Sequence, residues 1–189
     1  MNKTPVIIEA IGYLLFRLKQ ADKIKLVKLM FLADKYHAMN YGRTISDDAF
    51  LAFPHGPGGS RTMDILEYDP LVIGKHIKLA RGIFKQGKGH SYFAGVTCNP
   101  KSFTMLSESD FEALDFVINN FGPMNTWDLV DYTHKLKEWK RFKSLFLSGQ
   151  KKPEPIKSED LLWPVQDKFF SVEQEHLKES LYSMTKSPC

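Results

Sequence analysis

Residues 23–37 constrain the fold of this 189-residue chain more than any other stretch, because they contain a long, mostly apolar run. Between residues 24 and 33, eight of the ten side chains are apolar. At about 100° per residue, Lys25, Lys28 and Lys35 fall within roughly 80° of one another on a helical wheel. A helix with so narrow a polar stripe must be covered on most of its circumference. The stretch therefore predicts a buried central helix around which the other elements pack.

Both ends of this helix carry residues that favour helix termini. Asp22 can accept hydrogen bonds from the first turn, and Gly42 can adopt the left-handed conformation that ends helices. Residues 5–19 have apolar side chains at helical spacing and predict a preceding helix. Gly12 within it costs about 1 kcal/mol relative to alanine, which indicates close packing at that point. The link between the two helices is short, so we expect them to be antiparallel neighbours.

The pattern beyond the central helix indicates β-structure. Residues 49–53 form a short apolar run that predicts a strand, and residues 54–59 are rich in proline and glycine, which predicts a rigid turn without regular structure. Residues 72–84 and 90–97 are joined by a polar, glycine-containing connection and predict a β-hairpin. Since a two-stranded ribbon is marginal alone, we expect it to pack on the helices.

The second half of the chain returns to helical patterns. A cap at residues 107–110, with aspartate in place of the usual Glu or Gln, introduces a helix to Phe121. Two further helices are predicted over residues 127–134 and around residues 139–146. The sequence therefore predicts a mostly helical α+β single domain, in which helices and a small antiparallel hairpin or sheet wrap a central buried helix.

The chain is expected to divide into three parts. Residues 1–147 form the domain, and residues 148–158 read as a linker because they contain three lysines, two prolines and a glycine. Residues 159–189 form a C-terminal helical extension, which includes an apolar segment at residues 161–164. A capping box at residues 171–174 predicts the start of its helix.

Composition argues for a cytoplasmic protein without a membrane anchor. No apolar run approaches the roughly 18–20 residues needed to span a bilayer, and no signal-peptide pattern is visible. The two cysteines, Cys98 and Cys189, match no metal or redox spacing. The net charge of +4 permits an acidic partner or nucleic-acid contact and requires neither.

Six histidines are the first place to look for metal binding or catalysis. Asp34 and His37 are spaced to share one side of the central helix, and a zinc site would need further ligands from His55, His134 or Cys98. No HExxH or paired CxxC motif is present. We therefore favour structural or surface histidines, and we expect no metal site.

The proline- and glycine-rich residues 54–59 do not match a nucleotide-binding loop. They lack the lysine of the GxxxxGK[ST] motif and do not fit GxGxxG. Ser60 has no recognisable base partner at motif spacing. A turn that shapes the surface is the favoured interpretation, so we expect no cofactor and no catalytic set, and hence no enzyme.

The most basic stretch is residues 135–143, in which Trp139 and Phe142 interrupt five lysines and arginines. Such a stretch can form a nucleic-acid face with stacking aromatic rings. Helical spacing brings the two aromatic residues together, which favours a buried aromatic side opposite a solvated basic side. An acidic protein partner is a further alternative for the basic side.

The order of motifs along the chain resembles the Panacea domain, the SocA-like family of bacterial and phage proteins. The resemblance covers about residues 6–147, and its fairly specific part is a set of motifs in fixed order. These motifs are residues 25–34 (KLVKLMFLAD), His37, Tyr41-Gly42, Ala52, Gly56-Pro57, Leu106-Ser107, Thr126, Leu129, Thr133-His134 and Trp139. Gly58 departs from the valine that family members often carry after the Gly-Pro pair.

The resemblance implies an antitoxin that neutralises a cognate toxin by direct binding; one branch of the family acts as a protease adaptor that delivers the toxin for degradation. The expected partner-binding surface lies near exposed turn residues within 53–57 and near three motif residues within 133–139. These residues are Phe53, His55, Gly56, Pro57, Thr133, His134 and Trp139. A nucleic-acid-binding regulator is the runner-up, and a hydrolase that uses the histidines is a third, weaker alternative.

Overall fold

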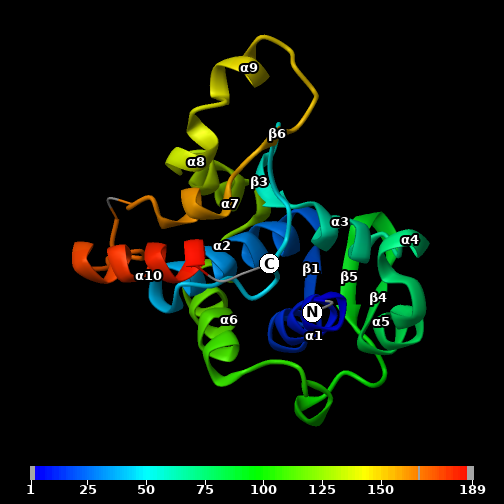
Figure 1. The fold of residues 1–189 in the computed structure, drawn as a ribbon. Coiled ribbons are helices and arrows are strands. Elements are labelled where there is room, and N and C mark those ends of the chain that lie inside the picture. Colours follow the sequence, from blue (N-terminus) through cyan, green and yellow to red (C-terminus); the bar gives the residue numbers. More distant parts are fainter. Residues whose placement is uncertain (1–2, 166, 187–189) are drawn as a thin grey trace.

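The computed structural model describes residues 3–165 and 167–186, and the central helix α2 (Lys23–Tyr41) organises them. The side chain of Asp22 accepts a 2.9 Å hydrogen bond from the backbone N–H of Lys25, as expected of an N-cap. Gly42 ends the helix in the left-handed conformation, with φ of 62°. Both predicted termini are confirmed, and Figure 1 shows α2 in the middle of the fold with other elements on every side.

Helix α1 (Thr4–Leu18) precedes α2, as predicted, and its inner side is buried. A Cβ added to Gly12 would lie 2.2 Å from Cγ2 of Ile83, at the end of helix α5 (Ile77–Ile83). The glycine is therefore required by the close approach of α1 and α5, which confirms the packing that its position indicated.

Helices α6 (Glu108–Phe121) and α7 (Thr126–Thr133) pack on α2 as well. The predicted capping box of α6 is present, because the backbone N–H of Ser107 donates to the carboxylate of Asp110 at 2.8 Å and the Ser107 hydroxyl accepts from the Asp110 N–H. Helix α7 is capped by Asn125, whose side-chain oxygen accepts from two backbone N–H groups of the first turn, each at 3.0 Å.

One small antiparallel sheet has the strand order β3-β2-β6. Strand β2 (Phe50–Phe53) confirms the predicted strand, but the expectation of irregular structure in the turn is wrong for Gly56–Gly59, which forms β3 and pairs with β2. A Cβ on Gly58 would lie 2.3 Å from Cγ1 of Val27. The absence of a side chain at Gly58 thus lets this strand lie directly against α2, which pattern rules that treat glycine as a strand breaker do not anticipate.

A second sheet has the order β1-β5-β4, with β1 (Gln20–Asp22), β5 (Ser91–Ala94) and β4 (Phe84–Gln86). A hairpin is present, as predicted, but its first arm is β4, which shares only Phe84 with the predicted arm and otherwise lies in the predicted connection. The prediction of a strand over residues 72–83 is wrong, because this segment is helical.

The helical segment consists of α4 (Pro70–Ile73), a 3₁₀ turn η1 (Gly74–His76) and α5. The side chain of Asp69 caps α4 by accepting from the Leu71 N–H at 2.8 Å. Within α5 the buried residues Ala80 and Ile83 lie three positions apart, which is a helical and not a strand spacing.

Two helical elements near the C-terminal end of the described residues contact α2. In place of one helix around residues 139–146, the structure has α8 (Lys137–Lys140) and α9 (Lys143–Leu147). Strand β6 (Glu154–Pro155) then pairs with β2, a 3₁₀ helix η4 (Ser158–Leu162) follows, and α10 (Gln174–Lys186) packs against α2. Figure 1 shows α9 standing out from the fold and α10 beside α2.

The architecture is the mostly helical α+β single domain that the sequence predicted, with a buried central helix and small antiparallel sheets. Within residues 3–165 and 167–186, no helix has the length and apolar character needed to cross a membrane.

Candidate partner-binding site

Four polar residues of α2 are buried and hold neighbouring elements, so they do not form a solvated polar stripe: Lys28, Asp34, Lys35 and His37. Lys35 is fully buried and lies 3.0 Å from the carboxylate of Glu138 in α8. Its ammonium also donates to the carbonyl oxygens of Leu161 and Trp163, at 2.8 and 3.0 Å. Burial lowers the pKa of Lys35 and raises that of Glu138, and their mutual attraction opposes both shifts. This pair fastens α8 and the C-terminal segment to the central helix.

Asp34 holds the loop that follows α2. Its carboxylate accepts from the backbone N–H groups of Ile45 and Ser46, at 2.8 and 2.9 Å, and from the Ser46 hydroxyl at 2.6 Å. Burial raises the pKa of Asp34 to about 7, although the hydrogen bonds from Ser46 oppose this rise. The aspartate of the α2 motif is therefore a structural residue.

His37 joins α2 to α6. One ring nitrogen lies 2.7 Å from the carbonyl oxygen of Arg43, and the other lies 3.0 Å from the Ser109 hydroxyl and 3.2 Å from the Asp110 carboxylate. Burial opposes ionisation of Asp110, but hydrogen bonds from His37 and Ser107 hold its pKa well below the ordinary value. Across the described part of the chain, no three His, Cys, Asp or Glu side chains are grouped to hold a metal.

Lys28 lies beneath the β2–β3 turn and is only 3% exposed. Its ammonium donates a 2.7 Å hydrogen bond to the carbonyl oxygen of Pro57. Gly56, with φ of 97°, lies so close that an added Cβ would be 3.0 Å from Cε of Lys28 and 2.7 Å from the hydroxyl of Thr133. Burial lowers the pKa of Lys28 to about 7.

The seven sequence-predicted site residues gather around this turn, but they differ in exposure. His55 is exposed and Phe53 and His134 are half-buried, whereas Thr133 and Trp139 are buried. The expectation that Gly56 and Pro57 are exposed turn residues is wrong, because both are buried in β3 against α2.

A stack of side chains supports the turn from below. The indole N–H of Trp139 donates to the carbonyl oxygen of Phe53 at 2.8 Å. The ring of His134 lies parallel to the indole, with 3.7 Å between ring centroids. Burial and the nearby charge of Lys28 lower the pKa of His134 to about 4, which keeps the stacked imidazole neutral.

In the basic stretch 135–143, the aromatic side faces the core and the basic side faces solvent, as its helical spacing favoured. Trp139 is buried and Phe142 is half-buried against the core, while the lysines of this stretch are exposed. The Trp139 ring is therefore not available to stack on a nucleic-acid base.

Two neighbouring depressions lie over the N-terminal end of α2. The first, which we call the His55 cleft, has a volume of about 240 Å³. It is lined by Lys23, Ile24, Val27, Lys28, Phe53, Pro54, His55 and Met63. Two of the sequence-predicted site residues, Phe53 and His55, thus form its wall.

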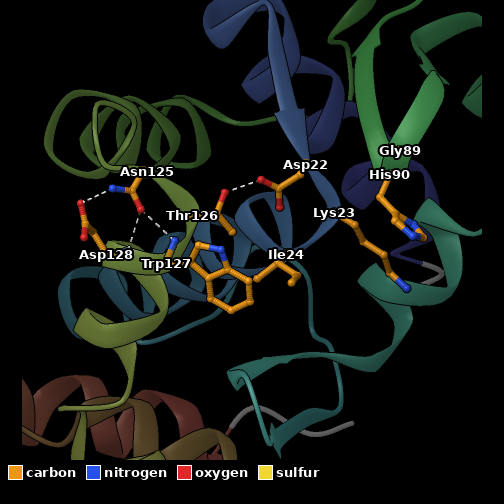
Figure 2. Close-up of a pocket in the computed structure, with 9 residues that line it drawn as sticks. All are labelled: Asp22, Lys23, Ile24, Gly89, His90, Asn125, Thr126, Trp127 and Asp128. Carbon is orange, nitrogen blue, oxygen red and sulfur yellow. Dashed lines mark hydrogen bonds between the residues drawn. The ribbon is translucent and has the colours of Figure 1, made fainter.

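The second depression, the Trp127 hollow, has a volume of about 900 Å³. It is lined by Asp22, Lys23, Ile24, Gly89, His90, Asn125, Thr126, Trp127 and Asp128. Figure 2 shows the indole of Trp127 beside Ile24, with His90 across the hollow near Lys23. The hydroxyl of Thr126 donates to the Asp22 carboxylate, so the N-terminal ends of α7 and α2 are tied together behind it.

The two depressions form one continuous face. Lys23 and Ile24 line both, and His55 contacts Trp127 edge to face, with 5.7 Å between ring centroids. Trp127 is 59% exposed. It is the residue of this face that sequence reasoning missed.

The fold and this face define the class of the protein as a small α+β domain built on one central helix. Buried polar side chains of this helix form hydrogen bonds with the elements around it. The chain matches the family described as antitoxin SocA-like, Panacea domain, over residues 26–140. This segment is more than half of the chain, and the protein belongs to that family. No curated protein and no solved structure gave a significant match.

Proposed function

We propose that this protein is an antitoxin that neutralises a toxin by direct binding, through the face formed by the His55 cleft and the Trp127 hollow. The observation that carries the proposal is the exposed indole of Trp127 between two depressions on the family-matched segment. Tryptophan is enriched among the residues that dominate binding energy at protein interfaces, especially beside pockets.

The construction beneath this face supports the proposal. Lys28 and Trp139 both donate to carbonyl oxygens of the β2–β3 region, and Asp22 accepts from Thr126 at the start of α7. These contacts fix the turn and α7 on the rigid helix α2. A surface held in this way loses little conformational entropy on binding, which favours affinity.

The proposal assigns the sequence-predicted residues two different tasks. Phe53 and His55 contact the partner directly, together with Trp127. The remaining five hold the contact surface in place from within: Gly56, Pro57, Thr133, His134 and Trp139. We place the protein and its toxin in the cytoplasm, with residues 1–147 as the binding domain, 148–158 as the connection and 159–189 as an extension.

The first experiment is co-expression with the protein encoded beside this chain. The expected result is rescue of growth and co-purification through a tag on the antitoxin. Rescue without a stable complex would indicate delivery to a protease, and loss of that rescue in a protease-deficient host would identify the adaptor mode. The proposal would be contradicted if the product of the neighbouring gene were toxic and this protein neither restored growth nor bound that product.

The site is tested in the same assay by Trp127→Ala. Tyr182→Ala is the matched control, because Tyr182 is an aromatic residue of nearly equal exposure, 60% against 59%, on α10 outside the proposed face. We expect rescue to be lost with Trp127→Ala and retained with Tyr182→Ala. Both variants should unfold at the wild-type temperature, since neither side chain is in the core.

A further inference from the structure

Two lysines of α2 are buried, but only one of them forms an ion pair with a carboxylate of the described residues. Lys35 has the carboxylate of Glu138 at 3.0 Å and donates to two carbonyl oxygens. Lys28 donates to the carbonyl oxygen of Pro57, and no carboxylate of residues 3–165 and 167–186 forms an ion pair with it. A buried ammonium without a carboxylate is costly, because a carbonyl oxygen replaces only part of its lost hydration.

The unpaired lysine is also the one that lines a cleft. Lys28 contributes to the wall of the His55 cleft, where the other contributing side chains are mainly apolar, including Ile24, Val27 and Met63. The volume of about 240 Å³ is that of about eight water molecules at ~30 Å³ each, which is sufficient for one leucine or phenylalanine side chain.

The ionisable residues that line the cleft are all of basic types. Its described lining includes Lys23, Lys28 and His55 and no aspartate or glutamate. Lys23 pairs with Glu67, which is an exposed carboxylate outside the lining. An apolar cleft with basic groups and no acid is complementary to an apolar side chain that has a carboxylate beside it.

We propose that the His55 cleft binds an acidic–apolar segment of the protein partner. An apolar side chain of that segment packs against Ile24, Val27 and Met63. A neighbouring aspartate or glutamate carboxylate is directed to Lys28, with His55 at the rim. This inference rests on the proposed function only in naming the toxin as the owner of the segment.

The assignment predicts a signature that a structural role for Lys28 would not produce. Lys28→Met removes a buried charge that has no carboxylate partner, and it also removes the donor to the Pro57 carbonyl oxygen. Burial of the charge is the larger cost of the two, so the free protein should become more stable while the acidic segment binds more weakly. A lysine needed only for folding would show the reverse relation, since its loss would lower stability and affect binding only through unfolding.

The test uses three short peptides as probes, because the partner segment is not identified: acetyl-Asp-Phe-Asp-amide, acetyl-Asn-Phe-Asn-amide and acetyl-Asp-Ser-Asp-amide. Binding is followed by NMR through the methyl signal of Met63, which lies in the cleft and is assigned with Met63→Leu. The first peptide should shift this signal at millimolar concentration. The amide and serine peptides should bind about tenfold more weakly, since each lacks one of the two recognised groups.

Variants complete the test. Lys28→Met should weaken binding of the acidic phenylalanine peptide by about tenfold, and Lys101→Met, which removes an exposed lysine outside the cleft, should not change it. Equal binding of the aspartate and asparagine peptides, an unshifted Met63 signal, or wild-type affinity in Lys28→Met would overturn the inference. Peptide binding without rescue of a toxic neighbour would instead refute the antitoxin proposal and leave the chemistry of the cleft intact.

Discussion

The indole N–H of Trp139 donates a 2.8 Å hydrogen bond to the carbonyl oxygen of Phe53, the last residue of β2. The two residues are 86 positions apart in the sequence, and their contact joins α8 to the turn that carries His55. The bond is shielded, because Trp139 is 3% exposed and is covered by the parallel ring of His134. Trp139, a buried residue of the family motif, thereby positions the exposed residue His55.

We predict that Trp139→Phe destabilises the protein by about 1–3 kcal/mol, because the carbonyl oxygen of Phe53 loses its buried donor. The phenyl ring keeps part of the stacking on His134, so the fold should persist. Urea unfolding measures the loss of stability. Trp163→Phe is the control, since the Trp163 ring packs on Arg141 instead of supporting the turn. Equal stability of Trp139→Phe and wild type would contradict the role of this hydrogen bond.

The Lys35–Glu138 pair gives a second prediction. Lys35→Met should destabilise the protein by about 3–5 kcal/mol, because the Glu138 carboxylate is left buried without its cation. The double variant Lys35→Met/Glu138→Leu should recover part of this loss, since no unpaired charge remains while the carbonyl oxygens of Leu161 and Trp163 still lack the lysine donor. Chemical denaturation of the two single variants and the double variant measures the interaction. Additive effects of the two substitutions would show that the residues do not act as a pair.

Lys28 gives a prediction in which stability depends on pH. Its pKa is about 7 in the folded protein and 10.5 when unperturbed, so between these values the unfolded chain binds more protons than the folded one. Titration of Lys28 therefore raises the free energy of unfolding as the pH increases from 7 to 10.5. Below pH 7 the full destabilisation by the buried Lys28 ammonium is present. We expect the gain in unfolding temperature of Lys28→Met over wild type to be largest near pH 6–7 and to shrink toward pH 10.

Comparison of the two proteins between pH 7 and 10 isolates Lys28, because His134, whose pKa the charge of Lys28 lowers, has an ordinary pKa of 6.5 and titrates below this range. A gain that is the same at all pH values, or a lower unfolding temperature for Lys28→Met near pH 7, would contradict the assignment of an unpaired buried ammonium.

The sequence was sufficient to predict the central helix, its two caps and the capping box of α6, because each of these depends on a few neighbouring residues. It was not sufficient for the segment that contains α4 and α5, where alternating residues favoured a strand and burial at helical spacing prevailed. Nor did it show that Lys28 and Lys35 are buried. Their partners, Pro57 and Glu138, come from other parts of the chain and meet α2 only in the folded protein.

The exposure of Trp127 could be predicted in part from the sequence. The buried residues of α7 include Leu129, Val130 and Thr133. At about 100° per residue, Trp127 lies roughly 115° from the centre of the stripe that they form. Its large apolar ring suggested packing, whereas its angular position indicated the surface. The two depressions beside it could not be foreseen, since they are formed by α2, β2, α3 (Ser60–Leu66) and the β4–β5 hairpin together.

The most direct test of the antitoxin account is calorimetric titration of the purified neighbouring toxin into wild type, Trp127→Ala and Tyr182→Ala. A central interface tryptophan contributes about 2 kcal/mol or more, so Trp127→Ala should bind about 30-fold more weakly or worse, while Tyr182→Ala should bind like wild type. Equal affinity of Trp127→Ala and wild type for the toxin would contradict the claim that this face is the antitoxin surface.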